Sequence, residues 1–213
     1  MPFCAIVPPY ILSRLAQSEP RAGHVAEAAK LTLELTARLG AERRKPPVQT
    51  LEETARAIER ACVRIIYDER GHTQLPGARV RSEGDAAIAD CVVDEAYDAA
   101  GIAYAFFDKV FDRNSIDGRG MHLVSSVHYA RDFDNAFWNG RQMVYGDGDG
   151  KAFTGFTTCL DIIGHELAHG ITQHECGLAY EGQAGALNES ISDVFGSLLK
   201  QWHRKQNATK RIG

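Results

Sequence analysis

Three observations predict an α+β fold for this chain. Its 213 residues, of which 44% are hydrophobic and 24% charged, are typical of a soluble globular chain of one to two domains with a sizeable core. Apolar residues recur at three- and four-residue steps in several stretches, which indicates helices. Short alternating runs bounded by glycine and proline indicate strands between them.

The N-terminal segment differs in texture from the rest. Apolar residues at helical spacing predict a helix over residues 23–39 that ends at Gly40. The basic, proline-stiffened stretch 43–47 then reads as a connector, and proteases favour such extended backbone. A second short helix is predicted over residues 51–65. We therefore place a boundary near this connector.

The remainder alternates strand and helix signals. Strands are predicted over 78–81, 121–129 and 142–145, and a long helix capped by Asp85 carries an apolar stripe from Ile88 to Val110 that we interpret as core packing. The glycine-rich loop 146–150 breaks the chain. Two helices, 160–174 and 188–203, follow with a glycine-rich connection between them.

Composition excludes several classes of protein. The 24 basic residues against 28 acidic ones leave a net charge of −4, so there is no basic excess for a nucleic acid partner. No apolar run of about 18 residues occurs, which excludes a membrane span. Five cysteines without a C-x-x-C pair favour reduced thiols. No basic residue precedes the first apolar run, and Pro8-Pro9 interrupts it, so we expect a cytoplasmic protein without a secretory signal peptide, with leaderless release left open.

The chemistry is concentrated in His165-Glu166-Leu167-Ala168-His169, an H-E-x-x-H pattern inside a predicted helix. Residues four apart lie one turn above each other, so both imidazoles can bind one metal ion while Glu166 lies beside them. Catalytic zinc needs a third protein ligand and one open position. Glu189, on the following helix, is the candidate for that ligand, and the alternative is a chance match of the pattern on a helix.

Asp193 lies one helical turn after Glu189, where its carboxylate can accept the free ring N–H of a ligand histidine. The alternative is an ordinary solvated helix charge. A closed structural zinc site is disfavoured because it has no use for a base such as Glu166 beside the metal.

Residues 90–201 resemble the catalytic N-terminal domain of the thermolysin-like zinc metallopeptidases. Besides the metal-binding motifs, the resemblance rests on Ser126-Val127-His128-Tyr129, Asn135-Ala136-Phe137-Trp138-Asn139-Gly140, Met143-Val144-Tyr145 with the loop 146–150, and Gly177-Leu178-Ala179-Tyr180. It implies a twisted, mostly antiparallel sheet packed with zinc-binding helices.

The same resemblance implies roles for individual residues. His165, His169 and Glu189 would be the zinc ligands, Glu166 the general base and acid, and Tyr180 a helper at the oxyanion. Asn188, with Asp193, would support the ligands from outside. Asn135 and Ala136 would align the backbone of a protein or peptide substrate as an added strand.

The leader resembles that of the protealysin subgroup, whose short propeptide begins with a Pro-Pro-hydrophobic motif, here Pro8-Pro9-Tyr10. Residues 1–50, with a boundary between 46 and 64, would then be a propeptide that lies over the cleft. The Cys4 thiolate is a candidate for the open position of zinc. The alternative is that Cys4 is a small buried apolar residue and that Pro8, Pro9 and Tyr10 block the cleft.

One calcium site of the family is altered, and another loop resembles an EF-hand calcium loop only in part. Asp161 matches a calcium ligand, but Lys200 stands where the next carboxylate belongs, so calcium is not expected at this double site. Asp147 and Asp149 resemble a calcium loop, but Thr158 stands where a bidentate glutamate is needed, and a tight turn is expected instead.

Residues 51–213 would form the catalytic N-terminal domain, and the helical second domain of the family, with its oxyanion histidine, is expected to be absent from this chain. His128, His174 and His203 do not lie in the matching motif and are interpreted as surface or packing residues. We therefore expect a precursor of a zinc metalloendopeptidase with little or no activity as this chain alone. The alternative is a non-catalytic zinc-binding module with the leader packed in the half-cleft.

Overall fold

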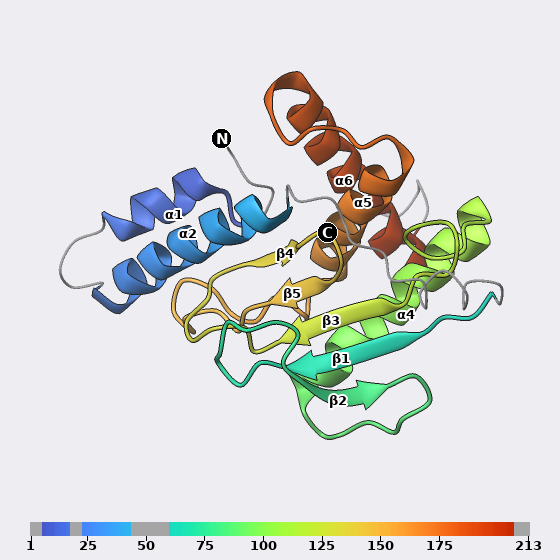
Figure 1. The fold of residues 1–213 in the computed structure, drawn as a ribbon, viewed down its shortest axis with the longest axis horizontal. Helices are drawn as coiled ribbons and strands as arrows, with labels where there is room; N and C mark the ends of the chain where they lie inside the picture. The colour runs from blue at the N-terminus through green and yellow to red at the C-terminus, as the bar shows by residue number, and fades with distance from the viewer. Residues whose placement is uncertain (1–5, 18–22, 44–59, 207–213) are drawn as a thin grey trace.

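A computed structural model describes residues 6–17, 23–43 and 60–206. The described part is an α+β fold with one sheet and helices at both faces (Figure 1). Its elements are α1 (Pro9–Ala16), α2 (Gly23–Arg43), β1 (Arg64–Asp68), β2 (Ala78–Ser82), α4 (Cys91–Phe111), β3 (Leu123–Val127), β4 (Ala136–Trp138), β5 (Met143–Tyr145), α5 (Leu160–Glu175) and α6 (Gly182–His203).

The sheet has five strands in the order β2-β1-β3-β5-β4. The two outer pairs, β1 with β2 and β4 with β5, are antiparallel, whereas the central pairs, β1 with β3 and β3 with β5, are parallel. The expected antiparallel pairing is therefore found in the two outer pairs of strands, whereas the strands in the middle of the sheet are parallel. Three of the strands match predicted ranges, and β4 is a strand that the periodicity did not indicate.

Two hydrophobic clusters form the core. The larger cluster contains α4, which packs against β1 and β3, together with apolar residues of α5 such as Ile163 and Leu167. The smaller cluster joins Leu35 and Leu39 of α2 to aromatic residues that include Phe133 of the loop before β4 and Phe137 of β4. In Figure 1, α1 and α2 lie side by side next to β4. The N-terminal helices are thus part of the folded core.

Helix α4 begins later than predicted. Its N-cap is Asp90, whose side chain accepts the N–H groups of Val92 and Val93. Asp85 instead accepts the N–H of Ser82 at 2.7 Å and closes the turn after β2. Asp85 therefore does not cap this helix, and Ile88 precedes the helix and is 42% exposed. The middle of the predicted stripe is buried, with Ala96, Ala99, Ala103 and Phe106 at 6% exposure or less, whereas Cys91 is exposed and Val110 is 47% exposed.

Helix α2 confirms the predicted helix and extends three residues beyond Gly40, to Arg43. Of the predicted helix 51–65, residues 51–59 lie outside the described residues. Its last two positions belong to β1, so a helix there is wrong. Ile65 and Ile66 pair with both neighbouring strands, and this ladder prevails over the helical spacing.

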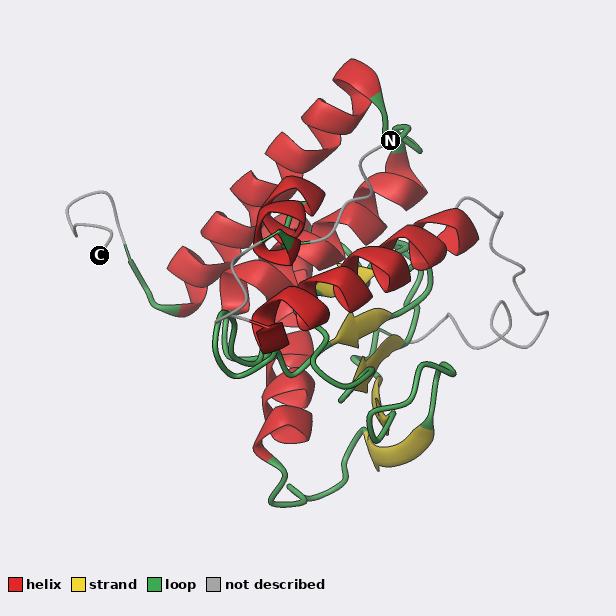
Figure 2. Cartoon of the chain, turned by 90° about the vertical axis from the view of Figure 1, so that its left-hand side faces the viewer, coloured by secondary structure: helices red, strands yellow, loops and turns green. Residues whose placement is uncertain are grey.

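Helices α5 and α6 pack against each other and approach closely at two glycines. Figure 2 shows several long helices beside the strands of the sheet. A Cβ on Gly164 would lie 3.0 Å from Cα of Gly196, and a Cβ on Gly196 would lie 2.4 Å from the carbonyl oxygen of Asp161. Only glycine permits this close approach. Helix α6 begins at Gly182, six residues before the predicted start at 188.

Among the described helices, none has both the length and the apolar character needed to cross a bilayer. Cys62, Cys91, Cys159 and Cys176 are free thiols, as expected, and Cys4 lies outside the described residues.

Candidate active site

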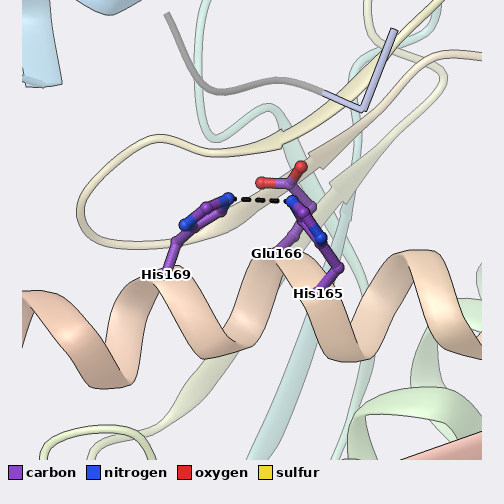
Figure 3. A group of neighbouring side chains, drawn as sticks. All are labelled: His165, Glu166 and His169. Atoms are coloured by element: carbon purple, nitrogen blue, oxygen red, sulfur yellow. Dashed lines mark hydrogen bonds between the residues drawn. The ribbon is translucent and has the colours of Figure 1, made fainter. Parts of the chain in front are cut away.

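His165 and His169 project from the same face of α5 toward one point (Figure 3). Their Nε2 atoms are 3.0 Å apart, and the two side chains are 8% and 0% exposed. Glu166 is also fully buried, and one donor atom from each of these three residues lies within 4.8 Å of the others. Two imidazole nitrogens and carboxylate oxygens are a donor set that zinc prefers.

Helix α6 brings a second carboxylate to the same point. Oε2 of Glu189 lies 3.3 Å from Nε2 of His165 and 3.9 Å from Nε2 of His169. Burial, and the negative charge of Asp193, raise the pKa of Glu189 to about 7 in the metal-free arrangement.

The three donor atoms form a triangle of a size that fits zinc. Its edges are 3.0, 3.3 and 3.9 Å. Tetrahedral zinc with bonds of about 2.0–2.1 Å has ligand atoms roughly 3.3 Å apart. The donor set and its spacing therefore fit one tetrahedral ion with one position left open.

The far ring nitrogens of both histidines have oxygen partners on α6. Oδ1 of Asp193 lies 2.9 Å from Nδ1 of His165, and Oδ1 of Asn188 lies 2.8 Å from Nδ1 of His169. When Nε2 binds a metal, Nδ1 carries the ring proton, which these oxygens accept. Ser192 Oγ also lies 2.8 Å from Nδ1 of His169. Ser192 was not singled out from the sequence, although its spacing of four residues from Asn188 places both on one helical face.

A backbone N–H of the sheet holds Glu166. The N–H of Trp138 in β4 donates to Oε2 of Glu166 at 2.8 Å. Strand β4 is at one side of the sheet, so this N–H is available to a side chain of α5. The contact fixes the carboxylate beside the two imidazoles. Tyr180, just before α6, has its ring 5.7 Å from the ring of His169.

The N-terminal segment pairs with the two residues expected to bind substrate. The N–H of Val7 donates to Oδ1 of Asn135 at 2.9 Å, and Nδ2 of Asn135 donates to the carbonyl oxygen of Val7 at 3.3 Å. The N–H of Ile6 donates to the carbonyl oxygen of Ala136 at 3.3 Å. The chain therefore lies along β4 as an added strand would.

These contacts come from residues 6 and 7, ahead of the expected Pro8-Pro9-Tyr10 motif. Pro8 is the N-cap of α1 and Pro9 its first residue, where a missing N–H is tolerated. Tyr10 is 66% exposed. Its side chain is therefore not buried among the described residues, and a plugging role for Pro8, Pro9 and Tyr10 stays a prediction. Cys4 lies outside the described residues.

The acidic residues that were compared with calcium ligands, Asp161 and those of the loop 146–150, have partners within the protein. Nζ of Lys200 lies 2.8 Å from Oδ2 of Asp161. Oδ1 of Asp149 accepts the N–H groups of Lys151, Ala152 and Phe153, which confirms the tight turn. Asp147 bonds to Nδ1 of His128, whose Nε2 lies 3.2 Å from Asp90. His128 is thus a bridge between α4 and the glycine-rich loop, which its sequence context did not reveal.

Sequence comparison agrees with this geometry. Residues 41–173 match the family model described as thermolysin metallopeptidase, catalytic domain. The chain belongs to the thermolysin metallopeptidase family. A second model, described as thermolysin metallopeptidase, alpha-helical domain, matches residues 176–213. This range lies within residues 51–213, which we expect to form the catalytic domain.

Relatives of this thermolysin-family chain are similar over nearly its whole length. An "Extracellular metalloprotease" of Pectobacterium carotovorum subsp. carotovorum is 46% identical over 96% of this chain and 57% of its own. "Protease PrtS" of Photorhabdus sp. (strain Az29) is 43% identical over 95% of this chain and 54% of its own.

A solved structure also matches. The precursor of protealysin, a metalloproteinase from Serratia proteamaculans, superimposes with a TM-score of 0.79 at 46% identity, covering 95% of this chain and 57% of the solved one. The chain thus spans a little over half the length of these relatives.

Proposed function

We propose that this chain is the leader and part of the catalytic unit of a zinc metalloendopeptidase precursor, with His165, His169 and Glu189 as zinc ligands. The observation that supports it best is the triangle of donor atoms, in which both histidines also have oxygen partners on their far nitrogens. Asp193 and Asn188 orient the two rings and make them better ligands.

Zinc bound there supplies a Lewis acid that polarises the scissile carbonyl and lowers the pKa of water. The residues of the chain do the rest. Glu166 takes a proton from the attacking water at Oε1 while the N–H of Trp138 holds Oε2, and then passes the proton to the leaving amine. Tyr180 assists at the oxyanion from its position beside His169.

Asn135 and Ala136 align a protein or peptide substrate through its backbone. The pairing of Ile6 and Val7 with them uses the same polar groups that an added substrate strand would use. The leader, residues 1–50 with a boundary between 46 and 64, therefore competes with substrate for this position.

Because the chain spans a little over half the length of its metalloprotease relatives, we expect it to have low activity by itself. Loss of one oxyanion donor lowers turnover by roughly 10²–10³-fold, and loss of positioning adds to this. We further propose that the ammonium group of Lys200 takes the place of calcium beside Asp161.

We also propose that the protein is made in a reducing compartment, in which its thiols stay free. Fractionation of producing cells would show whether it is later released.

Metal analysis and cleavage assays test the proposal together. The purified chain should bind one equivalent of zinc, His169→Ala should lose it, and Asp193→Asn should bind zinc roughly 10–100-fold more weakly. Ser190→Ala, exposed on the same helix, is the matched control. Glu166→Gln should keep the zinc and abolish whatever cleavage of casein the chain or its longer form shows.

Absence of zinc binding would overturn the metal site, and full cleavage by Glu166→Gln would overturn the role of Glu166. One bound zinc with no cleavage by the chain or by a longer form would favour the non-catalytic module.

A further inference from the structure

A buried acidic pair lies where the leader meets the rest of the protein. Asp134 is 0% exposed and Asp149 is 7% exposed. Oδ1 of Asp134 accepts the N–H of Asp149 at 2.7 Å, so the two residues are in contact. Neither residue belongs to the proposed metal site.

Each of these carboxyl groups has one oxygen that no hydrogen bond satisfies. Oδ2 of Asp134 and Oδ2 of Asp149 are buried and lack a hydrogen-bond partner in the part of the chain that the structure describes. A buried carboxylate without a partner is costly, and two adjacent ones repel each other. The three N–H groups on Oδ1 of Asp149 stabilise that residue as the anion. Asp134, with one such contact, is the member that gains from protonation.

Helix α2 of the leader closes over this pair. The N–H of Asp134 donates to Oγ1 of Thr32 at 2.9 Å, and Thr32 is 0% exposed. About one and two turns further along α2, Leu35 and Leu39 pack into the cluster that contains Phe133, the residue before Asp134. Undocking of α2 would therefore expose Asp134 to water.

We propose that Asp134 is a proton-controlled latch for the leader: α2 docks most tightly when the Asp134 carboxyl group is protonated, and ionisation of that group loosens the docked helix.

The direction of the effect follows from linkage. Burial, together with the nearby charge of Asp149, raises the pKa of Asp134 to about 6 with α2 docked. In water an aspartate has a pKa of about 4. The docked state therefore holds its proton to higher pH, so docking is most favourable in acid and weakens as the pH rises from about 4 to 6. With these two pKa values, the equilibrium constant for undocking of α2 rises roughly tenfold between pH 5 and 7 and changes little above pH 7.

Three other ionisable groups face this region. Asp149 lies on the glycine-rich loop, Asp132 precedes Asp134, and His24 of α2 has Nε2 3.6 Å from Oδ1 of Asp132. A positive charge on His24 would attract the nearby carboxylates and help to hold α2 in place. The two groups must therefore be separated by substitution.

Hydrogen exchange measured by mass spectrometry on the intact chain from pH 5 to 8 provides the test. After correction for the intrinsic exchange rate, amides of α2 should exchange roughly tenfold faster at pH 7 than at pH 5. The corrected exchange rate of amides in α4 should be the same at both pH values. Most helical stability in proteins comes from tertiary packing, so undocked α2 should exchange quickly.

Asp134→Asn mimics the protonated acid, because its amide carries no charge and keeps an oxygen that can accept the N–H of Asp149. It should abolish the rise and keep α2 protected throughout, whereas His24→Gln should retain most of the rise. A pH-independent α2 in the native chain, or a rise that His24→Gln removes and Asp134→Asn leaves intact, would overturn the latch.

The latch rests on the proposed function only in treating residues 1–50 as a leader. Because the readout uses neither zinc nor cleavage, a failure of the peptidase proposal would leave it interpretable.

Discussion

The side chain of Asn135 forms hydrogen bonds to both backbone polar groups of Val7, accepting from the N–H at 2.9 Å and donating to the carbonyl oxygen at 3.3 Å. An asparagine amide carries an acceptor oxygen and a donor nitrogen side by side, so it can bond both polar groups of one residue's backbone. The N-terminal segment is therefore bound as a peptide ligand of β4.

Asn135→Ala should release this segment. Loss of two largely buried hydrogen bonds costs about 1–2 kcal/mol, which corresponds to a roughly 5- to 30-fold faster exchange of the amides of α1. Hydrogen exchange on the intact chain measures it. Tyr10→Ala is the control, because Tyr10 is 66% exposed and its loss should leave exchange nearly unchanged. If Tyr10→Ala accelerated the exchange of α1 more than Asn135→Ala does, the result would favour a plugging role for Tyr10.

Gly196→Ala should separate the two helices of the metal site. The added methyl would lie 2.4 Å from the carbonyl oxygen of Asp161 and 3.0 Å from the backbone nitrogen of His165, so α6 must move. We expect a loss of about 1–3 kcal/mol in unfolding free energy, measured by urea denaturation, together with weaker zinc binding. Ser197→Ala, exposed on the same helix, should change neither. Unchanged zinc affinity in Gly196→Ala would mean that the crossing does not position Glu189.

Lys200→Glu should create a dependence on calcium. The ammonium group that now neutralises Asp161 would be replaced by a second carboxylate, which lowers stability without a cation. Millimolar calcium should raise the melting temperature of this variant and leave that of the native chain unchanged. Lys200→Gln removes the charge without adding a ligand and should not respond. Stabilisation of the native chain by calcium would contradict the replacement.

His128 should make stability depend on pH in the alkaline range. Hydrogen bonds that the His128 ring donates to Asp147 and Asp90 raise the pKa of His128 to about 9 against an ordinary value of 6.5. A raised histidine pKa adds stability that is complete below pH 6.5 and is lost as the pH rises through 9. Because the groups are partly accessible to water, we expect a decline of about 1–2 kcal/mol in unfolding free energy over that range. Urea denaturation at several pH values measures it, and His128→Gln should remove most of the slope. An equal slope in that variant would assign it to another group.

Much of the fold was predictable from local patterns. Helix α2, the buried stripe of α4 and the metal-binding turn of α5 follow from apolar spacing and from the four-residue separation of His165 and His169. The sequence does not single out Asp90 as the cap of α4, because Asp85 is an equally good capping residue. In the structure β2 pairs with β1 up to Ser82, and Asp85 is used in the turn that follows β2, so α4 begins later, at Asp90. Strand β4 has three residues, too few for any period to be visible.

The sequence by itself determined that two imidazoles and a carboxylate share one helical face, because helical geometry is local. It also placed Glu189 and Asp193 on one turn of a second helix. Only the tertiary structure decided that those helices meet, because the approach depends on Gly164 and Gly196, far apart in the chain. The docking of residues 6 and 7 on β4, and of α2 over Asp134, was decided in the same way. Contacts between distant segments depend on which surfaces become buried together, and no spacing along the chain records that.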